Sequence, residues 1–289
     1  MARIFPRRTK LTPIDNDVFI GYPDLLTPYY NQIDISVTFS YDKSKAEQMA
    51  VMWERYAGKV RLGGVAYGDR GDNFIAGQYL KFGALITSRG CPNSCWFCDV
   101  PDREGDIREL PIVEGWNLLD SNILACSDEH ISSVFGMLEY SKHKYHQSIE
   151  LTGGLEAKRL QDWHVNWLKI LHPKQLFFAY DTEDDYDPLF FAGKMLDKAE
   201  IPFNSRRCYV LCGFNGDTKG KAENRMLRTI EAGFIPMAMV YRNNFGLYDY
   251  TWSKFQKYWT RPAIMRAEGL LRRTKSITPR IKAGACGET

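Results

Sequence analysis

Several features that would assign this 289-residue chain to a common class of protein are missing from its sequence. No run of apolar residues approaches the roughly 18 that a membrane span requires. The basic start, residues 1–8, lacks the apolar core of an export signal. The seven cysteines therefore indicate a reducing compartment rather than a disulfide framework. We expect a cytoplasmic protein that does not enter a membrane.

The usual signatures of phosphate and ion binding are missing as well. Gly63 and Gly64 are adjacent, but two glycines alone do not make a phosphate-binding fingerprint. The acidic run at 183–185 lacks the glycine and the spacing of a calcium loop. The five histidines are scattered, and the formal net charge is only +3. Composition alone therefore points to a globular chain without indicating its chemistry.

What the sequence does contain is a compact group of three cysteines, Cys91, Cys95 and Cys98. Thiolates are soft ligands that suit iron–sulfur clusters and zinc. A closed site of either kind usually takes four protein ligands, and no fourth cysteine lies nearby in the sequence. Three thiols in one loop therefore predict a cluster with one iron left open for a ligand that is not protein.

The residues before the first cysteine support this prediction. The apolar run that ends at Thr87 predicts a strand, and Gly90 allows the backbone to wrap around a cluster. Parallel α/β barrels place their chemistry on loops at the carboxyl ends of strands. The C-x3-C-x2-C spacing, with Phe97 before the last cysteine, resembles the radical SAM superfamily, in particular the branch related to its cobalamin-dependent members.

This resemblance implies the cofactors and the type of reaction. The three cysteines would hold a [4Fe–4S] cluster whose fourth iron binds S-adenosyl-L-methionine (SAM). Reductive cleavage of SAM would then give a 5′-deoxyadenosyl radical that abstracts hydrogen from a small or nucleotide-linked substrate. The electron would come from a reducing partner such as flavodoxin or ferredoxin. In such enzymes the cofactor performs the difficult chemistry, while the protein binds and orients the reactants.

The first part of the chain, residues 1–79, is predicted to be an N-terminal α/β extension. Alternating apolar residues predict a strand at 34–40, helical spacing predicts a helix at 45–56, and a second strand is expected at 59–62. The extension resembles a shortened form of the domain that precedes the barrel in cobalamin-type radical SAM enzymes.

Residues 80–250 alternate strands with helices, which predicts a parallel sheet. The helix after the fourth strand is expected to use Asp187 as its N-cap and Pro188 as its first residue. Six strand–helix units match the partial (β/α)6 barrel of the radical SAM core, although barrel closure is implied only by the resemblance. The six strands are expected near residues 80–87, 116–120, 148–152, 176–180, 207–212 and 235–241.

Residues 251–289 are predicted to form a C-terminal helix and a basic tail. Trp252, Phe255 and Trp259 lie at helical spacing, and such an aromatic stripe favours core packing over stacking on nucleic-acid bases. Residues 261–282 hold seven Arg or Lys and the single acid Glu268. This segment is either a solvated tail or a surface that attracts phosphates and nucleic acid.

Polar residues and glycines follow the second and third predicted strands. Radical SAM proteins bind the methionyl ammonium near the second strand, so Asp120 and Asn122 are candidates, with Asp120 preferred because a carboxylate pairs with an ammonium. Gly153 and Gly154 follow the third strand and would let backbone approach a ligand. Glu156 would contact either the methionyl amine or the substrate. Each of these residues also has a simpler interpretation as part of a turn.

The fourth and fifth strands end in candidates for the nucleoside half of SAM. Asp181 is placed to bind ribose hydroxyls, as residues at strand ends do in nucleotide sites. The resemblance implies that Leu211 and Gly213 pack on the adenine, with Phe97 contributing from the cluster loop. The catalytic residue that would act on the substrate is not identifiable from the sequence.

Two further functions are compatible with the sequence. The basic segment and a loose likeness to radical SAM proteins of phage-type DNA modification suggest chemistry on a thymidine base in DNA. Alternatively, the chain is a non-enzymatic zinc or Fe–S module that binds nucleic acid, with Cys126 or His130 as a fourth zinc ligand.

Overall fold

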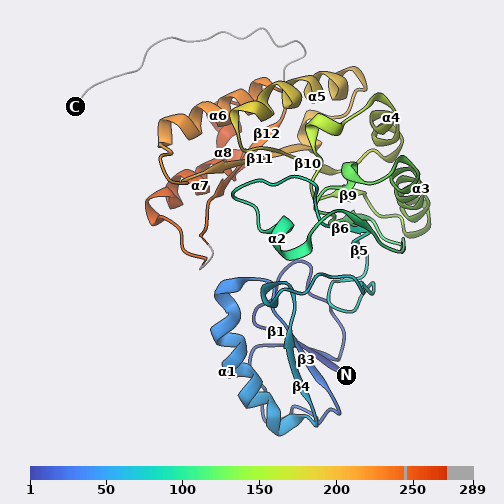
Figure 1. The fold of residues 1–289 in the computed structure, drawn as a ribbon. Helices are drawn as coiled ribbons and strands as arrows, with labels where there is room; N and C mark the ends of the chain where they lie inside the picture. Colours follow the sequence, from blue (N-terminus) through green and yellow to red (C-terminus); the bar gives the residue numbers. More distant parts are fainter. Residues whose placement is uncertain (244–245, 272–289) are drawn as a thin grey trace.

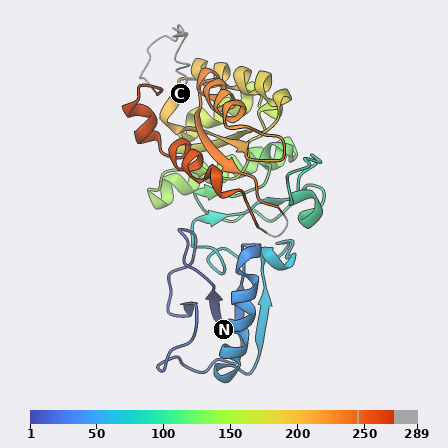
Figure 2. The same cartoon turned by 90° about the vertical axis from the view of Figure 1, so that its left-hand side faces the viewer.

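The structure is a computed structural model that describes residues 1–243 and 246–271. The chain forms two lobes, each built on a parallel β-sheet (Figures 1 and 2). Within the described ranges, no helix has both the length and the apolar character needed to cross a bilayer. The α/β fold class predicted from the sequence is confirmed.

The N-terminal lobe contains a four-stranded parallel sheet in the order β2-β1-β3-β4. Helix α1 (Lys43–Trp53) covers one face of this sheet, because Ile33 and Ile35 on β3 pack with Met49 and Trp53 on the helix. The predicted strand–helix–strand unit is confirmed, and β1 and β2 are additional strands. The strands are β1 (Ala2–Phe5), β2 (Val18–Ile20), β3 (Ile33–Ser36) and β4 (Val60–Gly63).

The second lobe contains a six-stranded parallel sheet in the order β12-β11-β10-β9-β8-β5, so neighbours in the sheet are neighbours in the chain. All six predicted strands are confirmed. In the described residues β5 and β12 are the two edges, and no ladder of hydrogen bonds joins them. The strands are β5 (Ala84–Leu85), β8 (Asn117–Leu118), β9 (Glu150–Leu151), β10 (Gln175–Tyr180), β11 (Arg206–Cys212) and β12 (Ile235–Val240).

Four helices connect successive strands of this sheet and lie along its outer side (Figure 1). Apolar residues on these helices form one core with alternate residues of the strands. The helices are α3 (Asp128–Tyr145), α4 (Asp162–Leu171), α5 (Tyr186–Lys198) and α6 (Lys219–Glu231).

The inner face of the sheet is partly open to water. Cys208 on β11 belongs to the core with the helices, so the next residue, Tyr209, points to the opposite face, where its ring stacks on Phe177 at 4.8 Å. Ala179 in the middle of the sheet is exposed, and Met239 is 44% exposed. An exposed side chain on the central strand β10 and another on the edge strand β12 show that no other layer covers this face completely.

Helix α5 does not begin where the sequence predicts. Its N-cap is Asp185 rather than Asp187, and Pro188 is its third residue rather than its first. The reason is a capping box just upstream, in which the side chains of Thr182 and Asp185 bond each other's backbone and start the helical turn earlier.

The C-terminal aromatic stripe is core, as predicted. Trp252 and Trp259 are 6% and 2% exposed, and helix α7 (Ser253–Trp259) packs against β12. Helix α8 (Pro262–Ala267) follows. Most of the predicted basic tail, residues 272–289, lies outside the described residues, so its proposed binding of nucleic acid stays a prediction.

Candidate functional site

The three cysteines lie on the connection from β5 to β8. This connection also forms a small antiparallel hairpin, β6 (Ser88–Arg89) with β7 (Arg108–Glu109), and the short helix α2 (Val100–Glu104). Helix α2 lies on the side of the second lobe that faces the N-terminal lobe (Figure 1). The cysteine loop, residues 91–98, therefore leaves the hairpin at β6 and returns through α2.

Gly90 fixes the start of the cysteine loop. Its φ of +88° is a conformation that only glycine adopts without strain. A Cβ at this position would lie 2.1 Å from the carbonyl oxygen of Asp106, so the space is also closed to any side chain. The prediction that Gly90 lets the backbone turn into the loop is consistent with both observations.

A buried carboxylate, Glu104, holds the two ends of the loop together. Its side chain is 1% exposed and accepts a hydrogen bond of 3.0 Å from the Gly90 N–H. Arg103 and Arg89 lie 2.7 and 3.5 Å from the other carboxylate oxygen. Ser121, after β8, donates to the same carboxylate at 3.3 Å. Sequence analysis missed this residue.

The three thiols are close enough to affect one another. Burial first, and then the like charge of Cys91, raise the pKa of Cys98. The pKa of Cys95 is raised in the same way, first by partial burial and then by the like charges of Cys98 and Cys91. A turn closed by the Cys98 N–H and the Cys95 carbonyl at 3.0 Å shapes the loop between them. Each thiol must lose its proton to bind iron, so metal binding at this loop releases protons.

Aromatic contacts hold the cysteine loop against residues at the carboxyl edge of the sheet. Trp96 is 62% exposed, and its ring lies 5.5 Å from Phe214 and 5.6 Å from Tyr241. These two rings follow β11 and β12, the last two strands, whereas the loop follows β5, the first. Phe97 is half-buried beside Trp96, with its ring 5.3 Å away. The loop therefore reaches from the first strand of the sheet to residues that follow the last two.

Asp120 has a structural role that sequence analysis did not foresee. Its carboxylate is 1% exposed and accepts three hydrogen bonds of 2.7 Å, from the Thr87 N–H, the Thr87 hydroxyl and the Ser88 hydroxyl. Burial nevertheless raises the pKa of Asp120. The residue ties the end of β8 to the start of the hairpin, which leaves it little capacity for an ammonium ligand.

Asn122 and Glu156 meet beside Cys91. The Asn122 amide nitrogen lies 2.7 Å from Glu156 Oε2 and 3.5 Å from the Cys91 sulfur. Arg159 donates to the same Glu156 oxygen at 2.7 Å. Two predicted residues from different strand ends are thus brought together at one predicted metal ligand.

Gly153 and Gly154 pack against protein rather than toward open space. A Cβ on Gly153 would lie 2.1 Å from the Asp120 carbonyl oxygen, and one on Gly154 would lie 2.4 Å from that of Ser121. Both glycines therefore let the turn after β9 pack on the turn after β8. The close approach predicted from the sequence exists, but its partner is backbone.

Asp181 lies after β10, on the same side as the thiols. It accepts a hydrogen bond of 3.1 Å from the Leu211 N–H, and its charge acts on the Cys95 thiol. Gly213, whose φ is +74°, packs against the ring of Trp252, which a Cβ would approach to 3.1 Å. Contacts of Asp181 with ribose, and of Leu211 and Gly213 with adenine, stay predictions.

The pKa of Asp181 leads to a prediction about stability. Burial, and then the like charge of Asp185, raise this pKa to about 7, whereas an unfolded aspartate titrates near ~3.9. Between these pH values the native chain holds the extra proton, so its unfolding free energy falls as the pH rises. Asp181→Asn lacks this titration. We therefore expect its unfolding free energy, measured relative to that of the wild type, to rise by about 2 kcal/mol between pH 4 and pH 7.

Urea unfolding at several pH values measures this difference. Asp184→Asn is the matched control, because Asp184 is an exposed acid three residues away. If the unfolding free energies of the wild type and Asp181→Asn changed with pH in the same way, the raised pKa of Asp181 would be contradicted.

Cys126 and His130 lie behind the hairpin. Burial raises the pKa of Cys126 to about 11, and His130 Nδ1 lies 3.7 Å from Glu109. Among residues 1–243 and 246–271, no three or more His, Cys, Asp or Glu side chains are arranged to hold a single ion.

Comparison with known proteins finds distant relatives of one kind. The chain is 30% identical to ribosomal protein uS12 methylthiotransferase RimO of Brucella anthropi in an alignment 142 residues long, and the match covers 46% of this chain and 30% of that protein. RimO of Brucella canis is 27% identical in an alignment 139 residues long, with the same coverage of both chains. The matches thus span less than a third of the relatives' length. No protein-family model matches the chain.

Proposed function

We propose that this chain is a radical SAM enzyme in which Cys91, Cys95 and Cys98 hold a [4Fe–4S] cluster at the mouth of a partial (β/α)6 barrel. One observation carries the proposal: a loop with this cysteine spacing follows the first of six sequential parallel strands and reaches residues beyond the last two. The distant similarity to RimO supports the same conclusion.

The residues present suit such a cluster. Three thiolates are appropriate ligands for iron, and each corner of a cubane takes its own thiolate, so the sulfurs need not converge on one point. When bound, the cluster and SAM would supply a 5′-deoxyadenosyl radical that takes hydrogen from the substrate. Gly90 and Glu104 give the loop a fixed start and a fixed return, so the ligands are pre-organised.

Glu156 is the better candidate for the methionyl ammonium than Asp120. Both oxygens of Asp120 are already used by Thr87 and Ser88. Glu156 is half-buried, and its partners Asn122 and Arg159 both bond the same oxygen, Oε2, while Asn122 also reaches the Cys91 sulfur. The other carboxylate oxygen would take the methionyl ammonium of bound SAM. A carboxylate beside an ammonium makes a strong charge-assisted hydrogen bond.

The substrate would bind over the inner face of the sheet. Ala179 and Met239 are exposed on that face, and the Phe177–Tyr209 stack forms part of its wall. An aromatic wall with exposed apolar groups suits a small or nucleotide-linked molecule. A reducing protein such as flavodoxin or ferredoxin would supply the electron from outside.

Anaerobic reconstitution of the full chain with iron and sulfide tests the proposal. We expect about four irons with sulfide per chain, an electron paramagnetic resonance signal after reduction that changes when SAM is added, and formation of 5′-deoxyadenosine. One zinc per chain without sulfide, or a cluster signal indifferent to SAM, would reject the proposal.

A further inference from the structure

A cavity of about 540 Å³ lies between the two lobes. It opens over the face of the four-stranded sheet that α1 does not cover, near the carboxyl ends of β3 and β4. In Figures 1 and 2 these strand ends point toward the second lobe. Residues 69–80 form part of the wall, and Ile86 and Arg89 of the second lobe complete it. In parallel α/β sheets, ligands bind at this edge.

The sheet face under the cavity has the wrong composition for a protein core. Parallel sheets usually bury apolar residues on both faces. Here Ile35 faces α1, whereas its neighbours Asp34 and Ser36 point to the other face. Arg61 and Gly63 on β4 lie in register with them. A polar sheet face under an open space is typical of a ligand site.

The acidic groups of the cavity already have partners. Asp34 is 6% exposed and accepts hydrogen bonds from the Tyr79 hydroxyl at 2.5 Å and the Gln32 amide at 2.8 Å. Burial, and then the hydrogen bond to Asp34, raise the pKa of Tyr79 to about 12, so the hydroxyl remains a donor. Asp69 accepts a hydrogen bond of 2.8 Å from the Gly71 N–H. Asp72 forms an ion pair with Arg108 at 2.5 Å.

The cationic groups keep unused donors. Arg61 is 63% exposed, and its contact with Asp34 is 4.0 Å long. Arg89 lies 3.5 Å from Glu104 through one nitrogen, and its buried Nε has no hydrogen-bond partner among the described residues. Arg61 and Arg89 therefore supply donors to the cavity, while Asp69 and Asp72 use one carboxylate oxygen each in the contacts described above. Donors in two guanidinium groups suit an anion rich in acceptors, above all a phosphate.

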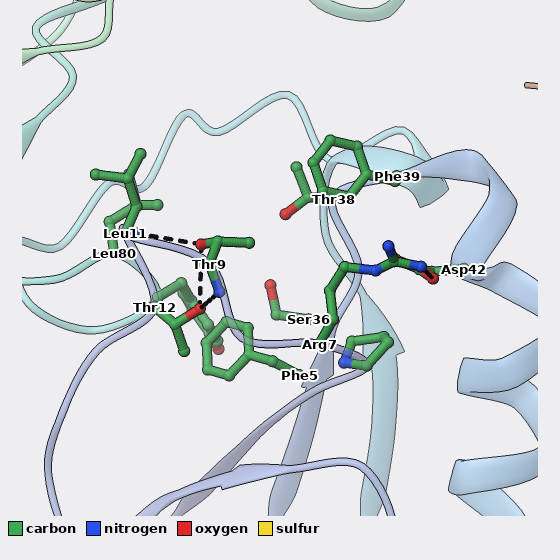
Figure 3. Close-up of a pocket in the computed structure, with 12 residues that line it drawn as sticks. Phe5, Arg7, Thr9, Leu11, Thr12, Ser36, Thr38, Phe39, Asp42 and Leu80 are labelled. Atoms are coloured by element: carbon green, nitrogen blue, oxygen red, sulfur yellow. Dashed lines mark hydrogen bonds and ion pairs between the residues drawn. The ribbon is translucent and has the colours of Figure 1, made fainter. Parts of the chain in front are cut away.

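The neighbouring hollow shown in Figure 3 does not share this character. It measures about 40 Å³ and adjoins the larger cavity at Ser36 and Thr38. Its cation, Arg7, is turned toward Asp42 and lies 2.5 Å from it. Because its volume is small and its charge is paired, we do not propose it as a ligand site.

We propose that the cavity between the lobes binds an organic phosphate of mononucleotide size. Arg61 and Arg89 hold the phosphate, one from each lobe, and Phe74 and Ile86 cover the uncharged part. The volume lies in the range of ligand pockets, roughly 300–1,000 Å³. This cavity is distinct from the SAM site proposed above, and Arg89, through its contact with Glu104, connects it to the cysteine loop.

Isothermal titration calorimetry on the full chain, without the cluster, tests the proposal. The ligands are the four 2′-deoxynucleoside 5′-monophosphates and the four corresponding 2′-deoxynucleosides. We expect at least one monophosphate to bind at least tenfold more tightly than its nucleoside, and added SAM not to compete. Arg61→Gln should weaken that binding about tenfold, since it removes a charge-assisted contact. Arg55→Gln is the control, because Arg55 is exposed in the same lobe and does not line the cavity.

A second variant blocks the space rather than removing charge. Gly63 lines the cavity, and a Cβ there meets no atom within 4 Å, so Gly63→Leu extends into open space. We expect this variant to fold and to lose monophosphate binding, whereas Gly63→Ala retains it. The proposal is overturned if no monophosphate binds more tightly than its nucleoside, if SAM competes, or if Arg61→Gln and Gly63→Leu bind like the wild type.

Discussion

Alanine at Cys91, Cys95 or Cys98 is expected to abolish SAM cleavage while leaving the fold intact. Two remaining thiolates cannot hold a cubane that needs three protein ligands. The side chains contribute little to the core, because Cys95 is exposed and the other two are half-buried. We therefore expect iron content and 5′-deoxyadenosine formation to fall by at least about 100-fold, with a melting temperature within about 2 °C of the wild type.

Iron and sulfide analysis and single-turnover assays after anaerobic reconstitution measure this effect. Cys126→Ala is the matched control, since Cys126 is a half-buried thiol outside the loop whose pKa of about 11 keeps it protonated near neutral pH. It should keep the cluster and the activity. If a loop variant retained a full cluster, or if Cys126→Ala lost it, the assignment of ligands would be wrong.

The strands of the second lobe could be predicted because each one is buried on its helix side. Runs such as 176–180 and 207–212 are apolar over most of their length, which is the pattern of a parallel strand. Whether the sheet closes could not be predicted in this way, because closure depends on its two edges. In the described residues no backbone pairing joins β5 to β12, and Trp96 of the loop after β5 contacts Phe214 and Tyr241, which follow β11 and β12.

The N-terminal lobe was only partly predictable. Val18–Ile20 is a three-residue strand, too short to show an alternating pattern. Ala2–Phe5 is a buried strand followed by Pro6 and two arginines. Because this start of the chain is basic, its sequence did not predict a strand. The structure shows that both strands complete a parallel sheet with a polar face, which the β3–α1–β4 unit alone did not reveal.

The sequence located the cysteines but not the residues that fix them. Glu104 stands in the charged stretch 102–109, where a solvated acid is the ordinary expectation. Only tertiary contact with Arg89 and Gly90 makes it a buried anchor. The one local signal was Gly105, whose φ of +76° ends α2 and returns the chain to the hairpin.

Glu104→Gln is therefore the substitution outside the cysteines from which we expect the largest effect on the loop. It removes the buried carboxylate that pairs with Arg89 and Arg103. Breaking such a buried pair lowers the unfolding free energy by about 3 kcal/mol. Burial alone would raise the pKa of Glu104, but the hydrogen bonds from Arg103 and the Gly90 N–H, with the nearby charges, lower it overall. The amides of residues 90–91 should exchange faster with solvent, and reconstituted iron should be lost sooner.

The pH dependence of this effect has a defined sign. A depressed pKa in the folded state means that the carboxylate stabilises the chain above its unfolded pKa, and that this contribution disappears as the pH falls through the folded pKa. The difference in unfolding free energy between wild type and Glu104→Gln should therefore be full at pH 7 and shrink below about pH 4. Asp102→Asn is the control, because Asp102 is an exposed acid on the same short helix. If both variants lost the same small stability, or if the Glu104→Gln deficit persisted unchanged at low pH, the carboxylate would not be the anchor of the cysteine loop.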